Sequence, residues 1–463
     1  MLNSSKATRW FALASFLAFL KFVVFVFDSN PQVFLGDSMS YLATAMAGWI
    51  PPDRSFLYGF VIHELTTRSR SLSSLVAVQS VAGILTALGT AAIVCRLIPA
   101  QFAIAAVAAV AIALEPQQLL YERFVMTETF STAVFTLLLL LALEYIRSRK
   151  AWLLIPMQLT GIVLVAFRLT YLPMLMVATV LGPIWAMMVS GGRDFVALSR
   201  HVVISVLLFF GLHTAYKQWN GWLSNLPAAY SYADGFFLIS NVSPLITAAD
   251  TDTPELIPVL AQPRVYGSDV AQFNSRNAEM FAPDGLVAQM ERVLGADYRA
   301  NVEAKRIAYH AIRRDPIGLV RLAFQTYLKF YSREYMSEIL RFEAGMSELE
   351  PEQLKTLALY HLDAKGLPSM KTLTRGYYLR AWPFYILLGL TPLILLVCSL
   401  LYRGETALIL SFLLVITTVH VAAVQVLGVE PSPRHLHSVS VVLAIAVGAL
   451  AGYPRQNQSS RKN

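Results

Sequence analysis

The sequence has little charge and almost no cysteine. Only 14% of its 463 residues are charged, whereas an ordinary soluble domain carries about 25%. Its two cysteines, Cys95 and Cys398, both lie in apolar segments, which argues against a disulfide framework and against a cysteine-based metal site. The net charge of +8 does not indicate a nucleic-acid partner, because the excess lies at the ends of apolar segments.

The chain has long apolar runs instead. Hydrophobic residues make up 56% of it, and its mean hydropathy is +0.55. Since a bilayer crossing takes roughly 20 apolar residues, the runs predict an all-α polytopic membrane protein with about ten spans. The run 10–27 has no small-residue cleavage site after it, so we interpret it as a retained span. The predicted spans are 10–27, 75–95, 100–114, 129–146, 151–167, 173–189, 202–216, 382–401, 406–428 and 438–452.

Lysine and arginine predict which ends of the spans face the cytoplasm. With the N-terminus inside, every cytoplasmic segment is positively charged, as the positive-inside rule requires. The charges are Lys6, Arg9, Arg96, Arg147, Arg149, Lys150, Arg193, Arg200, Arg403, Arg455, Arg461 and Lys462. Both termini are then cytoplasmic. The outer face receives 28–74, 115–128, 168–172, 429–437 and the long segment 217–381.

Three modules follow from this pattern. We expect a transmembrane module at 1–216, a mainly helical outward-facing insert at 217–381 and further spans at 382–463. Within the insert, segment 301–332 has apolar residues at helical spacing and a break near Asp315-Pro316, which predicts an amphipathic helix at the membrane surface. The short loops between the spans favour a location in a bacterial inner membrane. Membrane lipids are then among the expected partners of the protein.

The first outer loop contains an isolated acid. Asp37 follows the first span with apolar flanks, where burial can raise the pKa of a carboxyl and suit it to general-base work. The alternative is that Asp37 or Ser38 caps a helix over 38–48. Arg54 and Tyr58, in the same loop, are secondary candidates for the same cavity.

The second outer loop is rich in glutamate. Glu115, Glu122 and Glu128 crowd a short stretch between two spans, and Glu128 heads a long apolar helix. Thr127 or Glu128 can cap that helix and favour its positive end. Alternatively, Glu128 facing Asp37 can hold a divalent cation, which prefers oxygen ligands.

Two later outer segments contain arginine beside apolar runs. Arg168 lies in a short turn between two spans, where it either reaches to the interface or binds phosphate with its guanidinium fork. Arg434, His435 and His437 form a basic cluster before the last span. His-x-His is a weak metal signal without nearby carboxylates, so we favour anion binding by Arg434.

Taken in order, these pieces resemble the GT-C superfamily of membrane glycosyltransferases, which includes protein O-mannosyltransferases and the aminoarabinose transferase of lipid A. The order of the motifs and their shared membrane face carry the resemblance. The matching stretches are Gly36-Asp37-Ser38, Arg54 to Tyr58, Met126-Thr127-Glu128, Arg168-Leu169-Thr170, Ile312 to Ile317 and Arg434-His435.

The resemblance implies an inverting transfer from a polyprenyl-phosphate sugar to a hydroxyl of a glycan, lipid or protein acceptor. Asp37 would take the acceptor proton, while Arg168 and Arg434 with His435 would hold the departing phosphate. Glu128, with Glu122, would orient Arg434, or Asp37 and Glu128 would ligate Mg²⁺ or Mn²⁺. The insert would select the acceptor.

Two other classes of function compete with this one. A lipid-linked-sugar transporter or flippase would need polar residues deep within several spans, and the sequence has few: Lys21, Gln158 and His420. The absence of a repeat also weakens an alternating-access transporter. A non-catalytic membrane scaffold would use the insert to bind a partner.

Overall fold

The computed structural model describes residues 4–34, 37–66, 69–98, 101–192, 194–264, 266, 275–296, 298–346, 348–362, 365–428 and 432–460. Gly36 of the first motif and the charges Arg193, Arg461 and Lys462 lie outside these residues. Within them the chain is helical, and one isolated bridge between Gln32 and Phe124 is the only β-pairing. The predicted all-α class is confirmed for this part of the chain.

Seven helices in the described residues are long and apolar enough to cross a membrane. Three further apolar helices are shorter. Each of the ten predicted segments coincides with one of these helices, so the chain is an all-α membrane protein. The seven are α1 (Ser4–Phe27), α4 (Ser73–Leu97), α7 (Glu128–Ser148), α9 (Leu172–Val189), α10 (Phe195–Ser224), α20 (Trp382–Leu401) and α21 (Gly404–Leu427). The shorter ones are α5 (Phe102–Ala113), α8 (Leu154–Phe167) and the apolar stretch Val439–Tyr453 of α22 (Val439–Ser460).

Small residues bring the helices of the bundle together. Helix α4 packs on α5 and α7, and a Cβ added at Gly89 of α4 would lie 2.6 Å from Thr136 Cγ2 of α7. Alanines of α5 such as Ala105 and Ala109 are fully buried against this core. Helices in lipid gain little from the hydrophobic effect when they associate, so their packing relies on dispersion forces. Dispersion forces act only over short distances, and small residues allow the helices to approach closely. The outward side of α1 exposes Phe11, as expected of a lipid-facing helix.

The insert has its own core. Short helices pack there around buried residues such as Ile239 and Ile307. These helices are α11 (Asp234–Asn241), α12 (Ile257–Ala261), α13 (Ser275–Phe281), α14 (Leu286–Leu294) and α15 (Tyr298–Arg314). Three more, α17 (Arg333–Glu343), α18 (Pro351–Ala358) and α19 (Leu373–Arg380), follow later in the insert. Helix α10 runs on to Ser224, so the bundle reaches past the boundary predicted at 216.

The predicted break in the amphipathic segment is confirmed. Helix α15 ends at Arg314, and α16 (Pro316–Lys329) begins after Asp315, whose carboxylate accepts the Gly318 N–H at 2.7 Å. Proline at the first helical position and an aspartate before it are a strong start signal. The helix exposes Ile317, Val320, Phe324 and Leu328, spaced along one face.

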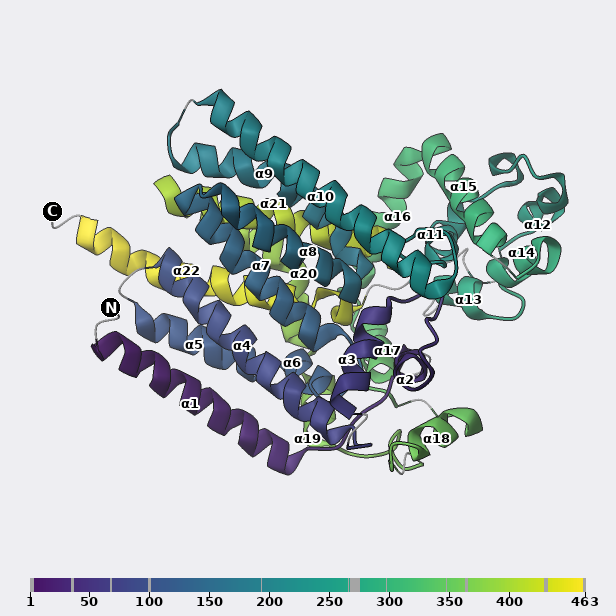
Figure 1. Cartoon of the computed structure of the whole chain (residues 1–463), viewed down its shortest axis with the longest axis horizontal. Helices are drawn as coiled ribbons and strands as arrows, with labels where there is room; N and C mark the ends of the chain where they lie inside the picture. The colour runs from purple at the N-terminus through teal and green to yellow at the C-terminus, as the bar shows by residue number, and fades with distance from the viewer. Residues whose placement is uncertain are drawn as a thin grey trace.

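The two ends of the bundle differ. Figure 1 shows both chain termini at one end and the insert at the other. The insert end also holds three short helices that follow or precede spans, namely α2 (Asp37–Ala47), α3 (Phe56–Thr66) and α6 (Pro116–Tyr121) (Figure 1). Loops that are far apart in sequence therefore meet there.

One charged pair is buried inside the bundle. Lys21 of α1 is 2% exposed, and its ammonium lies 2.5 Å from Glu122 Oε1 and donates to the Ala113 carbonyl at 2.6 Å. Glu122 also contacts Arg123 Nη1 at 3.1 Å. These bonds fasten α1 to the buried turn around α6.

We expect Lys21→Met to destabilise the protein by about 3 kcal/mol, because removing one partner leaves the other charge buried without its counter-ion. The measurement is thermal unfolding of the detergent-solubilised protein, with Lys6→Met, an exposed lysine of the same helix, as the control. Equal midpoints for the two variants would contradict the structural role of the pair.

Candidate active site

A cavity of about 600 Å³ lies where the insert meets the end of the bundle. Its walls come from α2, the turn after α2, the start of α7, the turn between α8 and α9, the insert helices α11, α13 and α17, and the segment before α22. Most of the wall is apolar, with residues such as Phe34, Phe167 and Phe342, and a few charged side chains converge within it. This is the composition of a ligand pocket.

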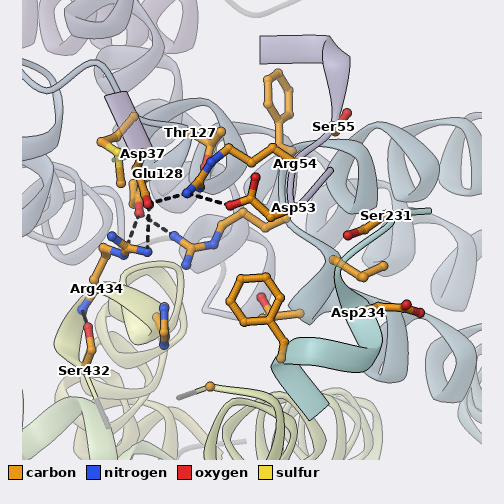
Figure 2. Close-up of a pocket in the computed structure, with 18 of the residues that line it drawn as sticks. Asp37, Asp53, Arg54, Ser55, Thr127, Glu128, Ser231, Asp234, Ser432 and Arg434 are labelled. Atoms are coloured by element: carbon orange, nitrogen blue, oxygen red, sulfur yellow. Dashed lines mark hydrogen bonds and ion pairs between the residues drawn. The ribbon is translucent and has the colours of Figure 1, made fainter. Parts of the chain in front are cut away.

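Asp37 is held by two arginines. Its Oδ1 lies 2.6 Å from Arg54 Nη2, and its Oδ2 lies 3.2 Å from Arg434 Nη2. Arg54 also reaches Asp53 at 3.0 Å (Figure 2). The carboxylate of Asp37 therefore connects the loop between α2 and α3 to the segment that precedes α22.

Glu128 is held by two arginines as well. Its Oε1 lies 2.6 Å from Arg168 Nη1 and 3.2 Å from Arg434 Nε, while the side chain is 1% exposed. Its second oxygen, Oε2, is buried without a hydrogen-bond partner. Arg434 thus pairs with both Asp37 and Glu128 (Figure 2). Its guanidinium also covers the Phe34 ring, 4.7 Å from the ring centroid.

Local structure explains why these side chains meet. Asp37 and Glu128 are each the first residue of a helix, where the peptide dipoles favour negative charge. Arg168 lies in the extended residue between α8 and a 3₁₀ turn at Leu169–Tyr171. Arg434 belongs to a 3₁₀ turn, Pro433–Leu436, whose start is capped by Ser432. All four positions are helix ends on the same side of the bundle.

Charge in the cavity shifts the pKa of its groups. Burial alone would raise the pKa of Asp37, but Arg54 and Arg434 outweigh it and lower that pKa, so the group is a carboxylate at neutral pH. Burial, together with positive Arg168 and Arg434, holds the pKa of His435 well below its usual value. His435 is therefore a neutral imidazole, and it adds no positive charge to the site.

Of the nine residues predicted for the site, six line the cavity. They are Asp37, Arg54, Glu128, Arg168, Arg434 and His435. The other three contact different groups: Glu122 pairs with Lys21, the Tyr58 hydroxyl donates to Gln79 at 2.9 Å, and His437 Nε2 lies 3.4 Å from Glu115. The prediction that Glu122 helps to orient Arg434 is therefore not met, because its carboxylate faces α1.

The cavity residues do not fit a divalent cation. Asp37 and Glu128, the expected ligands, both form ion pairs with the guanidinium of Arg434. In the part of the chain that the structure describes, no three His, Cys, Asp or Glu side chains group as a metal site. Because positive side chains already neutralise both carboxylates, a cation would have to displace Arg434.

Sequence reasoning missed Glu343 and Asp53. Glu343, at the end of α17, is 2% exposed and lines the cavity, and Asp53 lines it beside Arg54. Asp53 could have been found from its place next to Arg54 in the first outer loop. Nothing in the sequence around Glu343 distinguishes it from the other glutamates of the insert.

The chain matches no protein-family model, no curated protein and no solved structure. Its function therefore has to be argued from the cavity. Three arginines and five acids line this mainly apolar pocket, so it can bind an anion beside hydrogen-bond acceptors. Such a site suits a substrate that combines a phosphate, a hydroxyl and an apolar chain.

We expect Glu128 and Arg168 to be strongly coupled, because Glu128 is buried, Arg168 is only 11% exposed and either substitution breaks their 2.6 Å ion pair. A double-mutant cycle of Glu128→Gln and Arg168→Gln, read as thermal stability, should give a coupling of about 2 kcal/mol. The exposed pair Arg96 and Glu144, 3.9 Å apart at the other end of the bundle, is the control and should give under about 0.5 kcal/mol. Additive effects at Glu128 and Arg168 would refute the network.

Proposed function

We propose that this protein is a membrane glycosyltransferase that moves a sugar from a polyprenyl phosphate to an acceptor hydroxyl. The observation that carries the proposal is the convergence of Asp37, Glu128, Arg168 and Arg434, from four separate loops, in one cavity at the insert end of the bundle. The resemblance to the GT-C superfamily assigns the same residues to donor and acceptor chemistry.

The arginines supply the phosphate site. Arg168 and Arg434 share Glu128 as a partner, each through a single nitrogen, so donor N–H groups remain on both guanidinium forks. A phosphodiester that enters the cavity exchanges these ion pairs for bonds to its own oxygens. Negative charge grows on the phosphate as the glycosidic bond breaks, and fixed guanidinium groups stabilise that charge most in the transition state.

Asp37 supplies the base. Burial raises the pKa of Asp37, but the positive charges of Arg54 and Arg434 outweigh burial and lower this pKa. When Arg434 turns to the phosphate, Asp37 loses one of these partners and its pKa rises toward a value suited to general-base catalysis. Substrate binding thereby prepares the carboxylate to take the acceptor proton as the hydroxyl attacks the anomeric carbon.

The membrane supplies the orientation. We infer that the three shorter apolar helices complete a ten-span bundle, with both termini in the cytoplasm and the insert outside. The donor lipid then lies in the bilayer with its phosphate at the level of Arg168, which is only 11% exposed. The insert helices α11 and α13 form the facing wall, through which the acceptor enters.

The polar residues inside the bundle do not favour a transporter. Gln158 donates to Thr179 at 3.0 Å and to Ser205 at 3.2 Å, which ties α8 to its neighbours α9 and α10. The His420 ring stacks on Tyr171 with centroids 4.6 Å apart. With Lys21 paired to Glu122, each of the three is engaged in helix packing rather than along a path.

Deletion of the gene tests the function directly. We expect the polyprenyl-phosphate sugar that the protein consumes to accumulate, as measured by mass spectrometry of extracted lipids. Re-expression of the wild-type chain should remove the excess. An unchanged lipid profile, together with unchanged glycans, would argue for the scaffold alternative. Export of the lipid-linked sugar by proteoliposomes, without a transfer product, would argue for the transporter.

We expect Asp37→Asn to keep expression and donor binding and to lower transfer by at least about 10²-fold, since general-base catalysis contributes typically 10²–10⁴ in rate. Product formation by the purified variants is the measurement. Glu64→Gln, an exposed acid of α3, is the control and should transfer normally. Full activity of Asp37→Asn would overturn the assignment of the base.

A further inference from the structure

Glu343 is a buried acid that the proposed chemistry does not use. It is the last residue of α17, it lines the cavity, and it is 2% exposed. Both of its oxygens accept hydrogen bonds, one from the Tyr378 hydroxyl at 2.6 Å and one from the Ser432 hydroxyl. This carboxyl is therefore held in place by α19, through Tyr378, and by the segment before α22, through Ser432.

Ser432 connects Glu343 to the phosphate-binding arginine. The Ser432 hydroxyl oxygen accepts the backbone N–H of Arg434 at 3.1 Å and caps the 3₁₀ turn. Figure 2 shows Ser432 next to Arg434 at the edge of the ion-pair network. One chain of hydrogen bonds thus runs from the insert, through Glu343 and Ser432, to the turn that presents Arg434.

The surroundings of Glu343 contain charges of both signs. Arg434 and Arg168 face it as cations, Glu128 faces it as an acid, and Tyr378, with Tyr121 and Tyr385, surrounds it with phenols. Burial raises the pKa of Glu343 to about 7, against the lowering influence of Arg434. This carboxyl therefore changes its charge near neutral pH, while the cavity's arginines keep theirs.

We propose that Glu343 is a positioning residue that sets the charge of the phosphate site, so that the cavity binds an anionic phosphodiester most tightly when Glu343 carries its proton. The inference rests on the proposed function, because it takes a phosphodiester as the ligand. With Glu343 protonated, the charges of Arg54, Arg168 and Arg434 are balanced by Asp37, Asp53 and Glu128. Asp234, the remaining acid of the wall, is balanced by Lys305, whose ammonium lies 2.6 Å from its carboxylate. With Glu343 ionised, the site has one negative charge in excess and repels the ligand.

The direction of the pH dependence follows from linkage. A bound anion disfavours the charged form of a nearby carboxyl, so it raises the pKa of Glu343 above 7. Binding then takes up a proton, and affinity falls as the pH rises through that range. A rise of about one pKa unit, from about 7, corresponds to an affinity about fivefold higher at pH 6 than at pH 8.

Protonation also changes a hydrogen bond. An ionised Glu343 can only accept, so it takes the hydroxyl hydrogen of Ser432. A protonated Glu343 can donate to the Ser432 oxygen instead, which releases that hydroxyl hydrogen toward the cavity. Since Ser432 lines the cavity, the freed hydrogen gives the phosphate one more donor beside Arg434.

The test uses the purified full-length protein in detergent and a farnesyl methyl phosphodiester, whose single negative charge is constant from pH 6 to pH 8. We expect the wild-type chain to bind it about fivefold more tightly at pH 6 than at pH 8. Glu343→Gln should bind equally at both pH values, near the wild-type affinity at pH 6. Glu338→Gln, an exposed acid of the same helix, should retain the wild-type dependence.

Two further variants separate charge from position. Ser432→Ala keeps the carboxyl but removes the link to Arg434, so it should weaken binding at both pH values. A pH dependence should remain, with its midpoint moved upward, because the Ser432 hydroxyl also donates to the charged form of Glu343. Tyr378→Phe removes a hydrogen bond that favours the charged form, so it should move the midpoint of the pH dependence upward. Both variants remain informative if Glu343→Gln does not fold.

The outcomes distinguish the two levels of the proposal. If the wild-type chain binds no phosphodiester at any pH, the proposed function itself fails. If it binds equally at pH 6 and pH 8, or if Glu343→Gln or the Tyr378→Phe variant leaves the pH dependence unchanged, then the role of Glu343 is refuted and the phosphate site stands.

Discussion

The site depends on one guanidinium, that of Arg434, which forms ion pairs with two carboxylates in a mainly apolar cavity. Its Nη2 reaches Asp37 and its Nε reaches Glu128, each at 3.2 Å. Removing charges from water costs several kcal/mol per ion, so such a group is retained only with good partners. These ion pairs fix the positions of three parts of the chain relative to one another: the start of α2, the start of α7 and the segment before α22.

The rest of the fold serves this arrangement. In lipid the helices pack through small residues and polar contacts. These contacts determine where each helix end lies relative to its neighbours. Loops are then short, and the charged residues that they contain lie within a few ångströms of each other. The insert closes the remaining side: α17 and α19 bring Glu343 and Tyr378 against the turn of Arg434.

Much of this could be predicted from the sequence, for a physical reason. A helix that crosses lipid has to be apolar over its whole length, so the sequence shows the spans directly as apolar runs. An acid or arginine beside such a run is energetically costly, and it therefore indicates a functional site. Glu122 was misplaced because position in a short loop does not tell which way a turn of helix faces; α6 directs it toward Lys21. Glu343 escaped because its environment is made by tertiary contacts with Tyr378 and Ser432, which no local pattern records.

A cavity whose charges are already paired places a condition on its ligand. A free anion site would hold phosphate of any charge, whereas here the ligand approaches Arg168 and Arg434 beside Glu128 and Asp37, and an oxygen that takes an already paired nitrogen replaces a bond to one of these carboxylates. The exchange leaves carboxylates behind, and a second negative charge on the ligand would add repulsion from them. The network therefore favours a singly charged phosphodiester with an apolar chain over a doubly charged phosphate, and it leaves Asp37 released as the ligand binds. Binding and the supply of a base are in this way one event.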